Sequence, residues 1–259
     1  MTPERVSDLL EFAVEVAWRA GRTAFAHYQS GIPSETKADD SPVTVADRNA
    51  EHVARELIER RFPQDGIIGE EFGTVREGAA RRWILDPIDG TRTFIRGVPL
   101  FGCLLALEEN HEPIIGVMYF PALEETVYGE RGGGAWWNGR RARVSDTSEL
   151  DQALLVTTDI ENIHRTGYGA GFLRLNDECG MLRTWGDCYG HALVATGRAE
   201  IMLDPIMSVW DAAALKPIIE EAGGRFTSWT GEATHTGGSA VSTNGALADR
   251  ALQLLNGKS

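Results

Sequence analysis

The segment that most constrains the fold is Asp86-Pro87-Ile88-Asp89-Gly90-Thr91, which directly follows an apolar run at residues 83–85. The apolar run is typical of a β-strand. Pro87 fixes one backbone angle, and Gly90 can adopt a conformation that residues with a Cβ atom avoid, so the sequence predicts a tight turn after the strand. The chain must therefore fold so that one strand delivers two carboxylates, three residues apart, into a single turn.

Two carboxylates in such a turn are suited to binding a hard cation. Mg²⁺ prefers oxygen ligands, usually one or two carboxylates together with water and a substrate phosphate. The backbone carbonyl of Ile88 is placed where it can add a further oxygen. A short helix at residues 91–95 would begin after Gly90, so that its first amides face a phosphate. The alternative is an ordinary Asp-rich turn, but five fixed positions arise by chance in only about one of several million windows.

Three further acidic elements are ambiguous when each is considered alone. Glu70 and Glu71 follow an apolar pair and are either a solvated loop or a source of the additional carboxylate that a metal site needs. Asp211 lies in a first helical turn, where capping is the simpler interpretation. Asp47 either completes a capping box with the residue three positions before it, or accepts a proton from a hydroxyl such as that of Thr91. Sequence spacing leaves these alternatives open.

The pattern of predicted elements changes near residue 150. A helix signal begins at Thr2 and Pro3, a second helix is expected at 45–62, and short β-like runs follow, including a hairpin around 108–112. Beyond residue 150, strand and helix patterns alternate, with helices expected at 190–197, 209–222 and 245–255 and a loop at 167–171. This pattern predicts an α/β fold of layered sheets and helices with two parts, residues 1–150 and 151–259.

Composition restricts the partners of the protein. The 259 residues carry 38 acidic and 25 basic side chains, so the net charge is −13. This charge argues against nucleic acid or an anionic membrane as a partner. The apolar segments 97–107 and 113–123 are shorter than the roughly 20 residues that a membrane-spanning helix needs. The start of the chain lacks signal-peptide character, and three cysteines without C-x-x-C spacing indicate reduced, buried thiols, so a cytoplasmic protein is expected.

Taken together, four motifs resemble the inositol monophosphatase family of Mg²⁺-dependent phosphomonoesterases. They are V-T-V-A-D at 43–47, I-G-E-E at 68–71, W-I-L-D-P-I-D-G-T at 83–91 and W-D-A-A-A-L at 210–215. The resemblance implies an αβαβα sandwich, a homodimer, two or three Mg²⁺ ions per active site, and a phosphate site between the two halves. The metal ligands that it implies are Glu70, Asp86, the carbonyl of Ile88, Asp89 and Asp211. It further implies that Asp47 and Thr91 activate a water nucleophile, with Glu70 and Glu71 assisting, and that the amides of Gly90 and Thr91 hold the phosphate.

Within this family, the segment Arg183-Thr184-Trp185-Gly186-Asp187 is similar to the histidinol-phosphate phosphatase branch. The resemblance places Asp187 and Asp204 at the mouth of the substrate site, and Arg183 is a weaker candidate that can instead pair with a neighbouring acid or a partner subunit. The expected reaction is hydrolysis of the small phosphomonoester L-histidinol phosphate, a step of histidine biosynthesis. One alternative is an inositol-phosphate or broad sugar-phosphate phosphatase. Another is a silent Mg²⁺-binding regulator, which has no chemical need for the full set of acidic residues.

Overall fold

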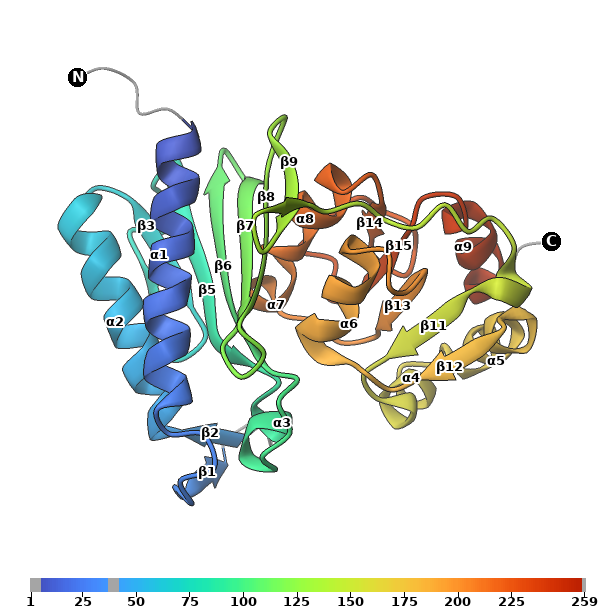
Figure 1. Ribbon diagram of the computed structural model, residues 1–259, viewed down its shortest axis with the longest axis horizontal. Coiled ribbons are helices and arrows are strands. Elements are labelled where there is room, and N and C mark those ends of the chain that lie inside the picture. The colour runs from blue at the N-terminus through green and yellow to red at the C-terminus, as the bar shows by residue number, and fades with distance from the viewer. Residues whose placement is uncertain (1–5, 37–41, 258–259) are drawn as a thin grey trace.

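Two β-sheets alternate with three layers of helices in the computed structural model, which describes residues 6–36 and 42–257 (Figure 1). Helices α1 (Val6–Phe25) and α2 (Val45–Arg61) form one outer layer, and β1 (Ser34–Thr36) and β2 (Pro42–Thr44) pair antiparallel in a small separate sheet near one end of these helices. The predicted αβαβα sandwich is confirmed. The helix cap predicted at Thr2 and Pro3 lies outside the described residues.

The first sheet has eight strands in the order β10-β9-β8-β7-β6-β5-β3-β4. Its strands are β3 (Gly66–Gly69), β4 (Gly73–Val75), β5 (Arg81–Asp89), β6 (Gly102–Glu109), β7 (Glu112–Phe120), β8 (Glu125–Glu130), β9 (Gly134–Trp137) and β10 (Arg140–Arg141). Strand β5 runs parallel to β3 and antiparallel to β6. The hairpin predicted around residues 108–112 joins β6 to β7.

Strand β5 lies between two hydrophobic layers, so its apolar side chains alternate between them. Trp83 and Leu85 belong to the core that packs against α1 and α2, whereas Ile84 belongs to the core on the opposite face of the sheet. This two-sided burial explains why residues 83–85 are a continuous apolar run rather than an alternating one.

The second sheet has five strands in the order β12-β11-β13-β15-β14. Its strands are β11 (Leu154–Thr157), β12 (Met181–Arg183), β13 (Ile201–Asp204), β14 (Arg225–Thr227) and β15 (Ala240–Thr243). Between the sheets lie α6 (Asp187–Ala195), α7 (Val209–Ala212) and α8 (Leu215–Glu221), while α5 (Gly169–Glu178) and α9 (Ala248–Asn256) cover the outer face of the second sheet. The remaining helical elements are α3 (Thr91–Ile95), α4 (Ile160–Arg165) and a short 3₁₀ turn at Leu150–Gln152. The predicted boundary near residue 150 lies in the connection between the two sheets, and a division into two domains stays a prediction.

Two predictions about local structure were wrong. The helix predicted at 209–222 is divided into α7 and α8, because Pro217 near the start of α8 cannot follow a continuous helix without a clash against the carbonyl four residues earlier. The glycine-rich segment 167–171, predicted as a loop, contains the start of α5. A Cβ atom at position 171 would lie 2.0 Å from the backbone oxygen of Leu255 in α9, so only a glycine allows α5 and α9 to pack this closely.

None of the described helices combines the length and the apolarity needed to cross a membrane. The three cysteines are free thiols, and Cys103 and Cys188 are buried whereas Cys179 is half-buried.

A buried ion-pair cluster around Glu108 on β6 joins distant parts of the chain. One carboxylate oxygen of Glu108 accepts hydrogen bonds from Arg82, with Nε at 2.8 Å, and the other lies 3.0 Å from Nε2 of His235. Burial by itself raises the pKa of Glu108, but the hydrogen bonds from His235 and Arg82 outweigh burial, so the pKa lies below its usual value. The charged form of Glu108 therefore stabilises the folded state.

We expect Glu108→Gln to lower the free energy of unfolding at neutral pH by about 3 kcal/mol, because the guanidinium of Arg82 loses its buried partner. The pKa of Glu108 is 4.5 in the unfolded chain and lower in the folded chain. The stabilisation is therefore complete above that value and is lost as the pH falls through the folded-state pKa. Urea unfolding of both proteins checks this prediction. The difference in free energy of unfolding between wild type and Glu108→Gln should narrow as the pH is lowered from neutral. A difference that does not change with pH would contradict the prediction.

Candidate active site

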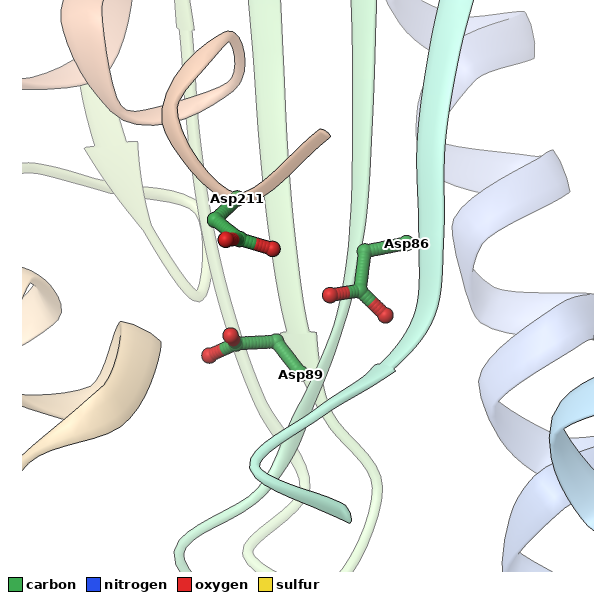
Figure 2. Close-up of side chains that lie close together, drawn as sticks. All are labelled: Asp86, Asp89 and Asp211. Atoms are coloured by element: carbon green, nitrogen blue, oxygen red, sulfur yellow. The ribbon is translucent and has the colours of Figure 1, made fainter. Parts of the chain in front are cut away.

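Three aspartates meet at the end of β5, where the first sheet faces the middle helices. Figure 2 shows the side chains of Asp86 and Asp89 from β5 and of Asp211 from α7 lying close together. One carboxylate oxygen of each lies within 4.8 Å of those of the other two. Residues 125 positions apart in the sequence thus form one acidic cluster, which we call the Asp cluster.

A bulge in β5 explains how two aspartates three residues apart reach the same cluster. Asp86 pairs with Leu104 and Asp89 with Gly102, so β5 contains one residue more than β6 over this interval. In a regular strand, residues three apart project to opposite faces, and one extra residue reverses that alternation. The tight turn predicted directly after residue 85 is therefore wrong: the strand continues in bulged form to Asp89, and the chain turns at Gly90, where φ is +84°.

Backbone amides hold each carboxylate of the Asp cluster in place. Asp86 Oδ1 accepts a hydrogen bond of 2.9 Å from the amide of Ile88, and Asp89 Oδ2 accepts one of 2.5 Å from the amide of Cys188. Asp211 Oδ2 accepts one of 2.7 Å from the amide of Ser208 within a capping box. Asp211 is thus both a helix cap and a member of the cluster, so the two interpretations of this residue are compatible.

Burial places these carboxylates in an unfavourable environment when they are charged. Desolvation raises the pKa values of Asp86 and Asp89 well above the usual range, and neighbouring acids, Glu70 among those around Asp86, raise them further. Burial also raises the pKa of Asp211, to about 6. A buried carboxylate and two half-buried ones, gathered within a few ångströms, are suited to binding a hard divalent cation.

Glu70 lies beside the cluster on a loop that a buried glutamate anchors. Glu51 of α2 is fully buried, and its carboxylate accepts hydrogen bonds from the amides of Glu71 and Phe72, at 2.7 and 3.1 Å. Arg55, one turn along the helix, donates to the same carboxylate at 2.7 Å. Glu51 therefore fixes the loop that carries Glu70 and Glu71.

Asp47 makes both of the contacts that the sequence left as alternatives. Its Oδ2 accepts hydrogen bonds of 2.7 Å from the amide and the hydroxyl of Thr44, which complete the capping box of α2. Its Oδ1 lies 3.4 Å from the hydroxyl of Thr91, which is also 3.0 Å from the carbonyl of Ile88. One carboxylate oxygen thus caps the helix, and the other faces Thr91. Burial raises the pKa of Asp47.

A cavity of about 540 Å³ opens over the Asp cluster. The predicted site residues that line this cavity are Glu70, Asp89, Gly90, Thr91, Asp187, Asp204 and Asp211. Asp47 and Asp86 are almost completely buried, as is the side chain of Ile88. Gly90 lies against Asp187, because a Cβ atom on Gly90 would be 2.9 Å from Asp187 Oδ2.

The hydroxyl of Thr158 links the two substrate candidates. It donates a hydrogen bond of 2.9 Å to Asp204 Oδ2 and accepts one of 2.8 Å from the amide of Asp187. Asp187 has a φ of +51°, and its Oδ2 accepts a hydrogen bond of 2.9 Å from Thr93. Burial raises the pKa values of both aspartates. We call Asp187 and Asp204 the carboxylate pair.

The structure does not bring Arg183 to this cavity. Its guanidinium donates to the carbonyl of Leu182 at 2.7 Å and lies 5.9 Å from the ring of the exposed Trp185. Arg183 therefore does not line the cavity, and the structure gives no support for a contact between Arg183 and the substrate.

Sequence reasoning missed several residues that shape the site. Thr93 and Thr158 hold the carboxylate pair, and the α4 segment lines the cavity through Asp159, Glu161, Asn162 and Arg165. These residues carry no recognisable motif, and only the fold brings them to the cavity. Glu51 did offer a signal, because it lies one helical turn after Asp47 and therefore on the same helix face.

Comparison with known proteins agrees with this architecture. The model of the inositol monophosphatase family matches residues 5–258. A histidinol-phosphatase from Chlorobaculum parvum is 45% identical over 95% of this chain and 94% of its own. One from Mycobacterium tuberculosis is 44% identical over 96% and 98%. The structure of an inositol monophosphatase from Zymomonas mobilis superimposes with a TM-score of 0.87 at 32% identity, covering 98% of this chain and 99% of the other.

A layered αβαβα sandwich with an acidic cluster at the end of a bulged strand defines a metal-dependent phosphoric monoester hydrolase. The chain belongs to the inositol monophosphatase family. The likeness extends over nearly the whole chain in both sequence and structure.

Proposed function

We propose that this protein hydrolyses L-histidinol phosphate to L-histidinol and phosphate, as a step of histidine biosynthesis, and that it requires Mg²⁺. The observation that carries the proposal is the carboxylate pair, which lines the same cavity as the Asp cluster but is separate from it. The names of its relatives from C. parvum and M. tuberculosis support the same substrate.

The metal site that we propose comprises Glu70, Asp86, the carbonyl of Ile88, Asp89 and Asp211, holding two or three Mg²⁺ ions. The close, mutually repelling carboxylates of the Asp cluster support this set. When bound, Mg²⁺ supplies positive charge to an otherwise acidic cavity and polarises the phosphoryl group.

Asp47 and Thr91 are the proposed proton acceptors in hydrolysis. The hydroxyl of Thr91 has one proton, which it can donate to Asp47 or to the carbonyl of Ile88. Donation to Asp47 leaves the lone pairs of Thr91 free to accept a hydrogen bond from the attacking water. As the water oxygen bonds to phosphorus, one water proton passes through Thr91 to Asp47, and the P–O ester bond breaks with the electron pair leaving on the alcohol oxygen. That oxygen takes up a proton from solvent water to give the alcohol, and Asp47 later returns its proton to solvent. Glu70 and Glu71 assist in orienting the water, and the amides of Gly90 and Thr91 hold phosphate oxygens.

Recognition of the leaving group is assigned to the carboxylate pair. Histidinol carries an ammonium and an imidazole group, whereas inositol and glycerol offer only neutral hydroxyls. Asp187 and Asp204 provide two carboxyl groups that are separate from the proposed metal ligands, and a bound cation would favour their charged form although burial raises their pKa values. A charge-assisted hydrogen bond to an ammonium group contributes about 1.5–3 kcal/mol, or roughly ten- to a hundredfold in binding.

The alternative substrate class is an inositol phosphate or another sugar phosphate, since the Zymomonas mobilis structure of the same fold is an inositol monophosphatase. The Asp cluster would serve either substrate equally well, so only the carboxylate pair distinguishes them. A homodimer, a cytoplasmic location and the absence of nucleic-acid or membrane partners stay predictions.

Removal of divalent metal is expected to abolish phosphate release from histidinol phosphate, and added Mg²⁺ is expected to restore it. The physical reason is the mutual repulsion of the Asp cluster, which also repels a phosphate dianion until cations neutralise it. Phosphate release measured after EDTA treatment and again after Mg²⁺ addition checks this. Undiminished release in excess EDTA would contradict the metal site, and no release from any phosphomonoester in Mg²⁺ would contradict the enzyme.

A further inference from the structure

A buried histidine with one unpartnered nitrogen lies behind the carboxylate pair. His191 of α6 has no exposed surface, and its Nδ1 is 2.7 Å from the hydroxyl of Ser242. Its Nε2 has no hydrogen-bond partner among the described residues. That same nitrogen is 4.0 Å from Asp204 Oδ2.

The second sheet explains why these three side chains meet. Strands β13 and β15 are antiparallel neighbours in which Met202 pairs with Ser242. Asp204 lies two residues after Met202 and therefore projects to the same face as Ser242. Helix α6 packs between the two sheets, over these strands. The imidazole of His191 thus lies between a hydroxyl on one strand and a carboxylate on the next.

The contacts of His191 determine which nitrogen carries its proton. Burial lowers the pKa of His191 to about 3, so the imidazole is neutral and has a single N–H group. If Nδ1 accepts a hydrogen bond from Ser242, the proton is on Nε2 and faces the carboxylate of Asp204. When Asp204 is charged, the opposite tautomer would direct a lone pair at its carboxylate, which is unfavourable in a buried site, so the charged form of Asp204 selects the tautomer with the proton on Nε2.

We infer that His191, held by Ser242, is a positioning residue that fixes the carboxylate of Asp204 for the cationic part of the substrate. The inference rests on the proposed function. His191 lies near Oδ2, the oxygen that also accepts the hydrogen bond from Thr158 at 2.9 Å. Thr158 thus holds this oxygen of Asp204 by a hydrogen bond, the imidazole of His191 lies 4.0 Å from the same oxygen, and Asp204 lines the cavity.

Two substitutions of His191 separate this role from simple packing. The amide nitrogen of Gln reaches the position of imidazole Nε2, so His191→Gln keeps a donor toward Asp204. The shorter Asn reaches only the Nδ1 position, so His191→Asn keeps a partner for Ser242 and loses the donor. We expect His191→Asn to raise KM for histidinol phosphate about fivefold with kcat little changed, and His191→Gln to restore KM to within about twofold of wild type.

The ligand dependence of these effects provides the second readout. L-Histidinol, tested as an inhibitor, should bind His191→Asn about fivefold more weakly, whereas inhibition by inorganic phosphate should be unchanged. KM for glycerol 2-phosphate, whose alcohol is neutral, should also be unchanged. Thermal unfolding of each variant shows whether it is folded. Equal losses for both esters and both inhibitors, or equal effects of Gln and Asn, would overturn the inference.

A double-mutant cycle with Asp204→Asn tests whether His191 acts through Asp204. On the Asp204→Asn background, His191→Asn should have no further effect on KM for histidinol phosphate, because the group that it positions is no longer charged. Additive effects would overturn the inference while leaving the proposed function intact. A wild-type enzyme with no preference for histidinol phosphate over glycerol 2-phosphate would instead overturn the proposed function, and the inference with it.

Discussion

Asp89→Asn is expected to lower kcat for phosphate release by at least about a thousandfold, because the substitution removes a charge from the proposed metal site. Asn has nearly the same volume as Asp, and its side-chain oxygen can still accept the hydrogen bond from the amide of Cys188. The loss is therefore expected without disruption of the local structure. Steady-state kinetics at saturating Mg²⁺ measures it.

Stability measurements separate this loss from misfolding. Asp89 is one of three neighbouring carboxylates that repel one another, so Asp89→Asn should unfold in EDTA at the wild-type temperature or above it. The stabilisation that Mg²⁺ gives the wild-type protein should be absent from the variant. Asp249→Asn is a matched control, because Asp249 is an exposed aspartate on α9 that pairs with Arg225 away from the cavity, and it should keep full activity. If Asp89→Asn retained most of the wild-type turnover, the metal assignment would be wrong.

Asp187→Ala is expected to reduce kcat/KM for histidinol phosphate by at least about tenfold, since one carboxylate of the pair that faces the substrate cation is lost. Hydrolysis of glycerol 2-phosphate should change much less. Asp187 has a φ of +51°, which alanine adopts poorly, so Asp187→Asn is the second variant needed. Asn accepts this conformation, and it removes the charge while keeping an oxygen near the hydroxyl of Thr93.

The two variants distinguish recognition from backbone strain. If charge recognition is the cause, Asn and Ala should both lose activity selectively on histidinol phosphate. If strain is the cause, only Ala should lose activity, and it should lose it on both esters. Equal losses on the two esters by both variants would mean that Asp187 supports the structure of the site, and the assignment of substrate would lose its main support.

Local signals predicted only part of the Asp cluster. Asp86 and Asp89 follow an apolar run, whereas the capping box around Asp211 indicated a helix cap, and only the family resemblance assigned Asp211 to the metal site. What the local signal did not contain was the bulge in β5. Its effect depends on pairing with β6, which is a property of the sheet rather than of the segment.

The residues that surround the cluster could not be predicted for a related reason. Thr158 follows β11, and His191 lies in α6, and neither belongs to a motif. Both acquire their roles only through the fold. The hydroxyl of Thr158 donates a hydrogen bond to Asp204 on the neighbouring strand, and the imidazole of His191 lies 4.0 Å from the same carboxylate. The break between α7 and α8 was different, because Pro217 was a visible signal that the apolar pattern outweighed.

The most direct test of the account is the ratio of kcat/KM for histidinol phosphate to kcat/KM for inositol 1-phosphate, measured side by side on the wild-type enzyme in Mg²⁺. The carboxylate pair predicts a ratio of at least about ten, since the leaving group of one ester is cationic and that of the other is neutral. It also predicts that the ratio falls toward one in Asp187→Asn. A wild-type ratio of one or below would contradict the account.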